Sequence, residues 1–413
     1  MANLLDQASI VLTPTAYDNG KVLCAKPSEP PYGDFDFSRN SAATRVNAQG
    51  LVENVQILSS NLVQNGDFSE EGVQEVSNGS FSQEGVELLS QPVNLVTDFT
   101  TNSGGVIVDA DTFTTSGGSL DGIKKSFLTV GKYYKLVIEG DTTSSGFTIG
   151  SLGNSGNEYG SGFGTHYFEC INSGLWIRQN TSGTTNITSF SIVEVGQDWT
   201  LGTGWSIGED KAICDGSGRI NPTNNSWLSG KTYKFDIEVS DRTAGYFRIQ
   251  NPAVSIYYVN NINSNGTYTY YINTIDANGF VIEAVGFDGS ITNISVKEVG
   301  QNWTLGGTAA IGDNLVNINS PSGENAEVYQ SSVLVIGRKY KLDCTLNKTS
   351  GDTQFVNGGT FILNNGSNVI QFTATDTRVY FKRGAGSVIS SITNISVIEI
   401  TDDTNLPRIN YEG

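Results

Sequence analysis

The clearest pattern in the chain is a strand in which apolar and polar residues alternate, and it occurs three times. It reads Gly-Lys-Tyr-Tyr-Lys-Leu-Val-Ile-Glu from Gly131, Gly-Lys-Thr-Tyr-Lys-Phe-Asp-Ile-Glu from Gly230 and Gly-Arg-Lys-Tyr-Lys-Leu-Asp-Cys-Thr from Gly337. In the second copy every other residue from Tyr233 to Val239 is apolar, and the residues between them are charged. A period of two is typical of a strand that buries one face.

A second strand signature follows each copy of the first. It reads Ile-Thr-Ser-Phe-Ser-Ile-Val-Glu-Val from Ile187, Ile-Thr-Asn-Ile-Ser-Val-Lys-Glu-Val from Ile291 and Ile-Thr-Asn-Ile-Ser-Val-Ile-Glu-Ile from Ile392. Copies of the first strand start 99 and 107 residues apart (230 − 131 and 337 − 230), which is the size of a small domain and not of a solenoid repeat. Asn-Gly, Asp-Gly and Ser-Gly pairs separate the short strands. The sequence therefore predicts an all-β protein of tandem antiparallel β-sandwich domains.

These signatures divide the 413 residues into six parts. We expect an N-terminal anchoring segment at 1–60, short strand-turn repeats or a linker at 61–93, sandwich modules at 94–197, 198–301 and 302–401, and a C-terminal segment at 402–413. Within the second part, Asn-Gly-Asp-Phe-Ser-Glu-Glu-Gly-Val from Asn65 returns from Asn78 as Asn-Gly-Ser-Phe-Ser-Gln-Glu-Gly-Val. Each unit is too short to form its own core, so we interpret it as strand and turn lying against a neighbour or another subunit. A flexible linker is the alternative.

Charge and cysteine content narrow the function classes. The net charge is −18, from 24 basic and 42 acidic residues, and no basic stripe occurs. A phosphate backbone would be repelled, so nucleic acid is excluded as a partner. The cysteines Cys24, Cys170, Cys214 and Cys344 fall one to a segment. Internal disulfides are therefore not expected, and Cys344, which replaces an isoleucine of the other copies, is predicted to be a core residue.

The sequence shows neither a signal peptide nor a membrane-spanning stretch. The start, Met-Ala-Asn-Leu-Leu-Asp-Gln, lacks the basic region and apolar run of a signal peptide. No apolar stretch approaches a membrane-spanning length. We expect a protein that folds inside a cell without secretion and does not insert into a membrane.

Aromatic residues of the second module are candidates for carbohydrate binding. Rings stack on the apolar C–H faces of sugars, and Asn, Gln and Asp side chains bond the hydroxyls. The candidate residues are Trp205, Trp227, Tyr257, Tyr258 and Tyr270. Ordinary core packing is the alternative, because adjacent tyrosines in a strand point to opposite faces.

Metal and catalytic chemistry have weak signals. Asp67, in Asn-Gly-Asp-Phe, is a candidate contact for calcium, but no Asp-x-Asp-x-Asp loop supplies the oxygens that this cation needs. No other cofactor is predicted. The single histidine, His166, is placed in a glycine-rich loop before a strand, and no Gly-x-Ser-x-Gly elbow accompanies it. No catalytic residue is predicted.

Several of these segments resemble a known family. The sequence Phe-Ser-Arg-Asn-Ser-Ala-Ala-Thr-Arg-Val-Asn-Ala-Gln-Gly-Leu-Val-Glu, within residues 34–53, resembles a segment widespread in structural proteins of tailed bacteriophages, especially those of marine and Bacteroidetes-type hosts. Residues 403–413 resemble the partner segment that follows it there. The Asn-Gly-Asp-Phe motif and the strand from Ile291 are similar to jelly-roll carbohydrate-binding modules that are inserted between the two in variable number.

This resemblance implies a non-enzymatic bacteriophage virion protein, either a fibre or a decoration subunit. Residues 1–60 would anchor it to other virion proteins, and the three jelly rolls would attach to host-surface glycans. A homo-oligomer is expected, with a trimer suggested by the resemblance. Three alternatives stay open: a purely structural fibre or spacer that binds no sugar, a polysaccharide depolymerase with two carboxylates about 5–9.5 Å apart, and the appendage of a cellular polysaccharide-degrading enzyme.

Overall fold

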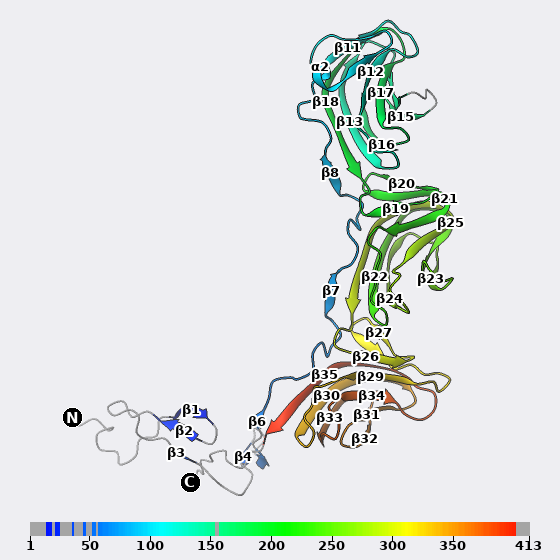
Figure 1. The fold of residues 1–413 in the computed structure, drawn as a ribbon. Coiled ribbons are helices and arrows are strands. Elements are labelled where there is room, and N and C mark those ends of the chain that lie inside the picture. Colours follow the sequence, from blue (N-terminus) through cyan, green and yellow to red (C-terminus); the bar gives the residue numbers. More distant parts are fainter. Residues whose placement is uncertain are drawn as a thin grey trace, which may run out of the picture. The chain divides into compact units, whose positions relative to one another are not determined.

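The computed structural model describes residues 57–152 and 157–401, together with five short strands that precede them. These are β1 (Pro14–Asp18), β2 (Lys21–Cys24), β3 (Phe35–Asp36), β4 (Thr44–Val46) and β5 (Val52–Asn54). The chain forms two compact units, one of residues 1–70 with 300–413 and one of residues 71–299. The first unit holds module 3, and the second holds modules 1 and 2 (Figure 1).

Module 1 follows a four-residue helix, α2 (Leu95–Asp98), and has ten strands: β9 (Thr100–Asn102), β10 (Gly105–Ile107), β11 (Thr112–Thr115), β12 (Gly122–Ser126), β13 (Tyr133–Thr142), β14 (Phe147–Ser151), β15 (Glu158–Ser161), β16 (Gly164–Glu169), β17 (Gly174–Gln179) and β18 (Gly183–Val195). Two sheets form, with the orders β10-β11-β18-β13-β16 and β15-β14-β17-β12-β9. Without the outer strands β10 and β9, and counting β11 as the first of eight strands, these orders are 1-8-3-6 and 5-4-7-2, the topology of a jelly roll. The fold class predicted from the sequence is confirmed.

Module 2 builds the same topology from longer strands: β19 (Trp199–Leu201), β20 (Trp205–Gly208), β21 (Lys211–Pro222), β22 (Thr232–Gln250), β23 (Tyr257–Ile262), β24 (Gly266–Asn273) and β25 (Val281–Val299). The first half of β22 pairs with β24 and its second half with β23. Its register against β25 shifts between Ser240 and Ala244, where Asp241 has φ 56°. Bulges of this kind bend a strand, so one strand serves both layers.

Module 3 repeats the separate-strand form of module 1: β26 (Thr304–Gly307), β27 (Ala310–Gly312), β28 (Leu315–Asn317), β29 (Ala326–Gln330), β30 (Lys339–Ser350), β31 (Thr353–Val356), β32 (Thr360–Ile362), β33 (Gly366–Thr373), β34 (Val379–Arg383) and β35 (Ile389–Thr401). Its sheets have the orders β28-β35-β30-β33 and β29-β34-β31-β32. Among the described residues, no helix is long and apolar enough to cross a membrane.

A buried tyrosine explains why the first signature repeats. Tyr134, Tyr233 and Tyr340 occupy the same place in their modules and are at most 2% exposed. Each hydroxyl accepts a hydrogen bond from the main-chain N–H five residues upstream, at 2.9, 3.0 and 2.9 Å. The ring fills the core and the hydroxyl fixes the preceding turn, so both its apolar and polar parts are satisfied. Cys344 is buried as predicted, and burial raises the pKa of its thiol to about 12.

Residues 57–89, which we call the strap, complete the sheets of all three modules. The strap contains β6 (Ile57–Leu58), β7 (Glu71–Gln74) and β8 (Glu84–Glu87). β6 pairs with β35 of module 3, β7 with β25 of module 2 and β8 with β18 of module 1 (Figure 1). The strap repeats therefore run in the opposite order to the modules that they contact. Modules 2 and 3 are discontinuous in sequence, because later strap repeats and earlier modules lie between each of them and its own strap repeat, whereas module 1 follows its strap repeat directly.

The same hydrogen bonds recur at each strap contact. Side-chain oxygens of Asn61, Gln74 and Glu87, which are 13 residues apart (74 − 61 and 87 − 74), accept from the main-chain N–H groups of Val397, Val296 and Ile192 at 2.9, 2.6 and 2.7 Å. The next strap residue donates its N–H to the carbonyl of that same strand residue, at 2.8 to 3.0 Å. The strap thus has three repeats, one more than the sequence pattern indicated.

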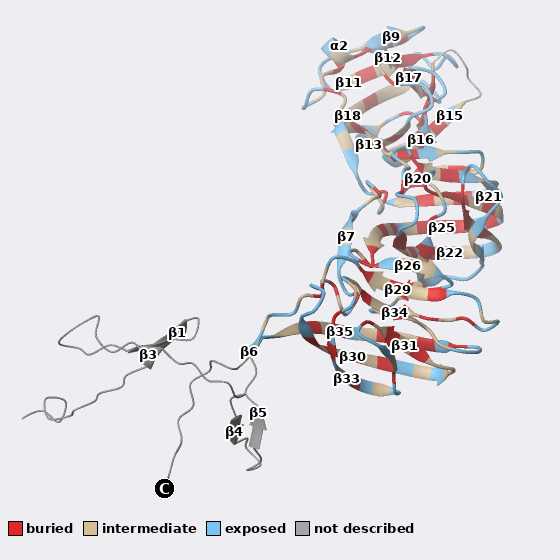
Figure 2. Cartoon of the chain, turned by 60° about the horizontal axis from the view of Figure 1, so that its bottom comes forward, coloured by how far each residue is buried: buried red, intermediate tan, exposed pale blue. Residues whose placement is uncertain are grey.

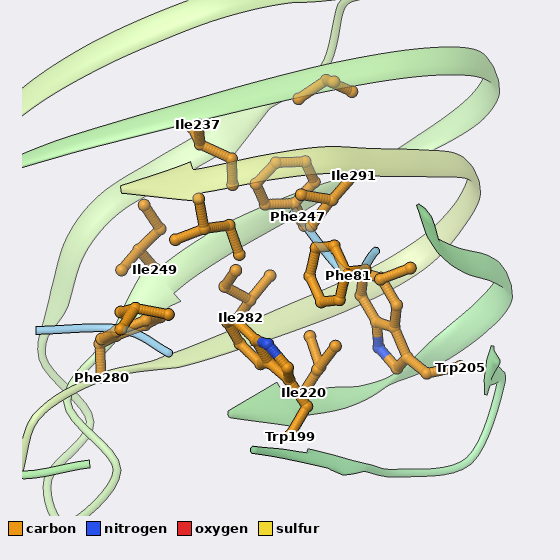
Figure 3. Packing of buried hydrophobic residues seen from close by; sticks show 14 of the residues in the cluster. Phe81, Trp199, Trp205, Ile220, Ile237, Phe247, Ile249, Phe280, Ile282 and Ile291 are labelled. Atoms are coloured by element: carbon orange, nitrogen blue, oxygen red, sulfur yellow. The ribbon is translucent and has the colours of Figure 1, made fainter. Parts of the chain in front are cut away.

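The turn after a strap repeat docks on a tryptophan. In module 2 the Phe81 ring lies 4.9 Å from that of Trp199, whose Nε1 donates to the carbonyl of Asn78 at 2.9 Å (Figure 3). Module 3 has the same arrangement, with Phe68 at 5.2 Å from Trp303. The residues at 61–93 that contain these turns were interpreted as strand and turn against a neighbour; in the structure, β7 and β8 and their turns lie against modules of their own chain.

Gly79 provides a test of the strap contact. A Cβ at this position would lie 2.0 Å from the carbonyl oxygen of Ile294, which belongs to backbone that cannot move aside. We expect Gly79→Ala to lower the free energy of unfolding by about 1–3 kcal/mol. The N–H of Ile294, which donates to the Gly79 carbonyl at 2.9 Å, should lose protection in hydrogen exchange.

Gly216→Ala is the matched control for that substitution. A Cβ at Gly216 meets nothing within 4 Å, so its effect on the free energy of unfolding should stay within about 0.5 kcal/mol. Equal stability of the two variants in urea unfolding would show that the strap turn is not held against β25.

Candidate functional site

The structure separates the five aromatic candidates by exposure. Trp205 and Trp227 are each only 3% exposed and belong to the core of module 2, where Figure 3 shows Trp205 among the packed side chains. Trp227 stacks on Tyr233 with ring centroids 4.9 Å apart. Both indoles therefore use their faces for internal packing, and neither is placed to stack on a sugar. Core packing, the alternative weighed for these residues, describes the two tryptophans.

Two of the tyrosines also pack against this core. The Tyr258 ring lies 5.7 Å from that of Trp227, and its hydroxyl accepts from Asn251 Nδ2 at 3.0 Å. Tyr270 stacks on Tyr268 at 6.2 Å, on the side of β24 that contacts the core. Burial raises the pKa of both Tyr258 and Tyr270. Both tyrosines pack against the core of module 2 and offer little ring surface to a ligand.

Tyr257, in contrast, is 42% exposed and lies beside a row of charged side chains. Arg219, Glu283 and Arg248 are cross-strand neighbours on β21, β25 and β22. Glu283 binds Arg248 Nε at 2.6 Å and Arg219 Nη2 at 2.9 Å, and the Arg248 guanidinium lies 4.3 Å from the centroid of the Tyr257 ring. The row holds an aromatic ring and fixed donors on one outward face.

The carboxylate in this row is held in its charged form. Partial burial acts to raise the pKa of Glu283, but hydrogen bonds from Arg219 and Arg248 outweigh it and the pKa is lowered below its usual value of 4.5. A group in that state accepts hydrogen bonds from hydroxyls but does not supply a proton near neutral pH.

Module 3 carries a similar set on the equivalent sheet. The Arg378 guanidinium lies 5.4 Å from the Tyr329 ring and 5.0 Å from the Tyr380 ring. Asp376 holds Arg378 through Nε at 3.0 Å and Nη2 at 2.6 Å. The Tyr380 hydroxyl donates to Glu327 at 2.6 Å. Both tyrosines are half-buried, so ring edges and polar groups face solvent together.

Module 1 has a third set, again on the equivalent sheet. The Arg178 guanidinium lies 5.5 Å from the ring of Trp176 and binds Glu158 at 2.7 Å. Trp176 alternates with the core residues Leu175 and Ile177 and so projects from the opposite face of β17. It is 3% exposed, yet its Nε1 has no hydrogen-bond partner among the described residues.

Modules 2 and 3 thus place an arginine, a partly exposed aromatic ring and a carboxylate together on the outward face of one sheet, whereas in module 1 the Trp176 ring of the corresponding set is covered. Sequence analysis missed the arginines because it ranked aromatic residues by abundance. Alternation within each strand was the available signal: Arg178 and Arg248 sit next to the core residues Ile177 and Ile249. The chain has 24 basic residues against 42 acidic ones, so an arginine on an outward face stands out from its acidic composition.

The structure places Asp67 in a turn and His166 in a strand. Asp67 accepts from the main-chain N–H and the hydroxyl of Ser69, at 3.3 and 2.9 Å, so its carboxylate stabilises a turn. Within the described ranges, no group of three or more His, Cys, Asp or Glu side chains could hold a metal ion. His166 lies in β16 and not in a loop before it, with Nε2 at 3.0 Å from the Gly162 carbonyl.

Comparisons with known proteins give fold likenesses only. No family model matches the chain, and no curated protein matches its sequence. Among solved structures, the tandem CBM22-1–CBM22-2 domains of Paenibacillus barcinonensis Xyn10C match with 10% identity and a TM-score of 0.18, covering 78% of this chain and 99% of theirs. The triple jelly-roll protein of an archaeal virus turret assembly matches with 15% identity and a TM-score of 0.20, covering 74% and 90%. At these scores neither likeness bears on function.

Tyr380 offers a direct test of the module 3 geometry. Burial, and then the hydrogen bond to the Glu327 carboxylate, raise the pKa of Tyr380 from 10.0 to about 12. We expect Glu327→Gln to lower this pKa toward 10 without reaching it, because burial persists. The raised pKa of Tyr380 stabilises the folded protein fully below pH 10, and this stabilisation is lost as the pH rises through 12.

The measurement is an ultraviolet titration of tyrosinate against a Tyr380→Phe reference, which isolates this phenol. Lys382→Gln, which changes a charge on the same strand, serves as the control. An unchanged pKa in the Glu327→Gln protein would contradict the Glu327–Tyr380 contact.

Proposed function

We propose that this chain is a non-enzymatic adhesive protein of a bacteriophage particle, a fibre or decoration subunit that binds host-surface glycans through its jelly-roll modules. The observation that carries the proposal is the arginine, aromatic ring and carboxylate set on the outward face of the same sheet in modules 2 and 3. A sugar ring can pack its C–H face on the aromatic side chain while the charged groups bond its hydroxyls. Tyr257 is the most accessible such ring among the predicted residues.

Repetition supports adhesion more than tight binding by a single module. Each set offers a sugar one or two rings and a few charged groups, so the affinity of one face for one sugar is expected to be modest. Linked weak sites gain affinity together, since later contacts are intramolecular. Two such faces in one chain suit a ligand with many copies of one sugar, such as a surface polysaccharide.

The ionisation of the carboxylates favours binding over polysaccharide cleavage. A glycosidase needs one carboxyl group with a raised pKa as the proton donor. Here the pKa of Glu283 is lowered by its arginine partners despite burial, and that of Asp376 is lowered, chiefly by Arg378. The purely structural spacer remains the competing function, and it predicts no glycan binding at all.

Substitution of Tyr257 tests the glycan proposal. On an array of bacterial surface polysaccharides, the unmodified protein should retain a subset of them. Tyr257→Ala should weaken retention roughly tenfold, the equivalent of about 1.4 kcal/mol, whereas Tyr257→Phe keeps the ring and should bind nearly as well. Ile256→Ala, an exposed neighbour in sequence, is the control.

Failure to bind any polysaccharide on the array would favour the structural spacer. A fall in polymer viscosity on incubation would favour the depolymerase. Equal loss in Tyr257→Ala and Ile256→Ala would place the binding elsewhere in the chain.

The anchoring part of the proposal has its own test. Removal of residues 1–56 leaves the strap whole, because β6 begins at Ile57. We expect such a chain to fold with an unchanged melting temperature and to be absent from purified particles by mass spectrometry. Its recovery in particles at the normal level would show that the N-terminal segment does not attach the protein.

A further inference from the structure

The charged row of module 2 carries one more positive than negative charge. Arg219, Glu283 and Arg248 are cross-strand neighbours on β21, β25 and β22, and along these strands Figure 2 shows buried residues alternating with less buried ones. Among the described residues, Glu283 is the only carboxylate that bonds either arginine. The residues two positions before and after these three on their own strands are all uncharged: Ser217, Asn221, Val281, Val285, Tyr246 and Gln250.

The two arginines also keep hydrogen-bond donors that the protein does not use. Glu283 accepts from Nε and Nη2 of Arg219, at 3.1 and 2.9 Å, and from Nε of Arg248 at 2.6 Å. Within the described part of the chain, no acceptor bonds Nη1 of Arg219 or either Nη of Arg248. The two Nη groups of one guanidinium form a planar fork that matches the two oxygens of a carboxylate.

This fork is held in place and is open to solvent. The Arg248 guanidinium packs 4.3 Å from the centroid of the Tyr257 ring, and Glu283 holds its Nε, so two contacts restrict its position. The Arg248 side chain is 22% exposed and that of Arg219 is 55% exposed. A ligand can therefore reach donors whose arrangement is already fixed, which lowers the entropic cost of binding.

The corresponding set in module 3 has balanced charges. Arg378 is held by Asp376 through both Nε and Nη2. Lys382 lies directly across the sheet from Glu327. Two basic side chains thus stand against two acidic ones. The surplus positive charge distinguishes the face of module 2 from that of module 3.

We propose that the outward face of module 2 binds an acidic sugar, whose carboxylate is held by the unused guanidinium donors of Arg248 and Arg219 while its ring packs on the exposed part of Tyr257. This inference rests on the proposed glycan binding and adds the chemical class of the ligand. Hydrogen bonds between a guanidinium and a carboxylate are charge-assisted and about twice as strong as bonds to a neutral hydroxyl. The two arginines outnumber Glu283, so a second carboxylate meets net attraction.

Chemical reduction of the polysaccharide tests the ligand class directly. The probes are the array polysaccharides whose retention falls in Tyr257→Ala, each compared with the same polymer after its carboxyl groups are reduced to alcohols. We expect these polymers to contain carboxylated sugars, and their reduction to weaken retention roughly tenfold. The comparison is made at about 0.15 M salt, where the Debye length of about 8 Å screens the distant acidic residues of the chain.

Substitution of Arg219 tests the same inference from the side of the protein. Arg219→Gln removes the surplus charge and leaves the contact of Arg248 with Tyr257, so we expect retention of the acidic polymers to fall roughly fivefold. Arg219→Lys keeps the charge and should retain them better than Arg219→Gln. Lys211→Gln is the control, because it removes one positive charge from the same strand at a residue that pairs with Asp241, and it should bind normally.

The possible outcomes separate this inference from the proposed function. Equal retention of native and reduced polymers would overturn the acidic ligand and leave glycan adhesion standing. Equal losses in Arg219→Gln and Lys211→Gln, at matching melting temperatures, would also overturn it, because net charge alone would then explain the effect. Retention of no polymer by the unmodified protein would contradict the proposed function and this inference together.

Discussion

The structure depends on the pairing of a strap repeat with the last strand of each module. In module 1, β11 covers β18 only at residues 183–186, and β8 pairs further along, at Val193 and Val195. Without the strap, the last strand of each module would lose this pairing. The Trp–Phe contact at the end of the module would be lost with it. Free strand edges invite aggregation, so a chain that carries three modules gains by supplying its own covering strand. The recurring side-chain oxygen that caps the N–H of Val397, Val296 or Ile192 fixes the register.

This pairing would also allow a further module to be added. Each module with its strap repeat is a complete unit, and a new unit can be inserted inside an existing one without breaking any strand contact. The 13-residue strap repeat and the module of roughly a hundred residues must be duplicated together. The division of the chain into residues 71–299 and the two flanking parts follows one of these nested boundaries.

The outward faces show how one scaffold can carry different surfaces. Core residues such as Tyr134, Tyr233 and Tyr340 are tied to a fixed hydrogen bond and do not vary between modules. The aromatic partner of the arginine is a tryptophan in module 1 and tyrosines in the others, and it lies on different strands. Side chains on the outward face make fewer packing contacts than core side chains. They can therefore change with little effect on the stability of the fold.

The sequence by itself determined the all-β class and the buried face of the three repeated strands, because a period of two and glycine turns are local properties. It could not assign the strap, since the partners of residues 57–89 lie up to 344 residues away (401 − 57). The sequence also offered Trp205 and Trp227 as candidates for carbohydrate binding. The number of aromatic residues in a module does not show which side of a sheet each of them occupies. The tertiary structure decided that only Tyr257 of the five candidates exposes its ring widely, and that arginines on neighbouring strands meet the aromatic rings. Side-chain neighbours across strands depend on register, which local pattern does not encode.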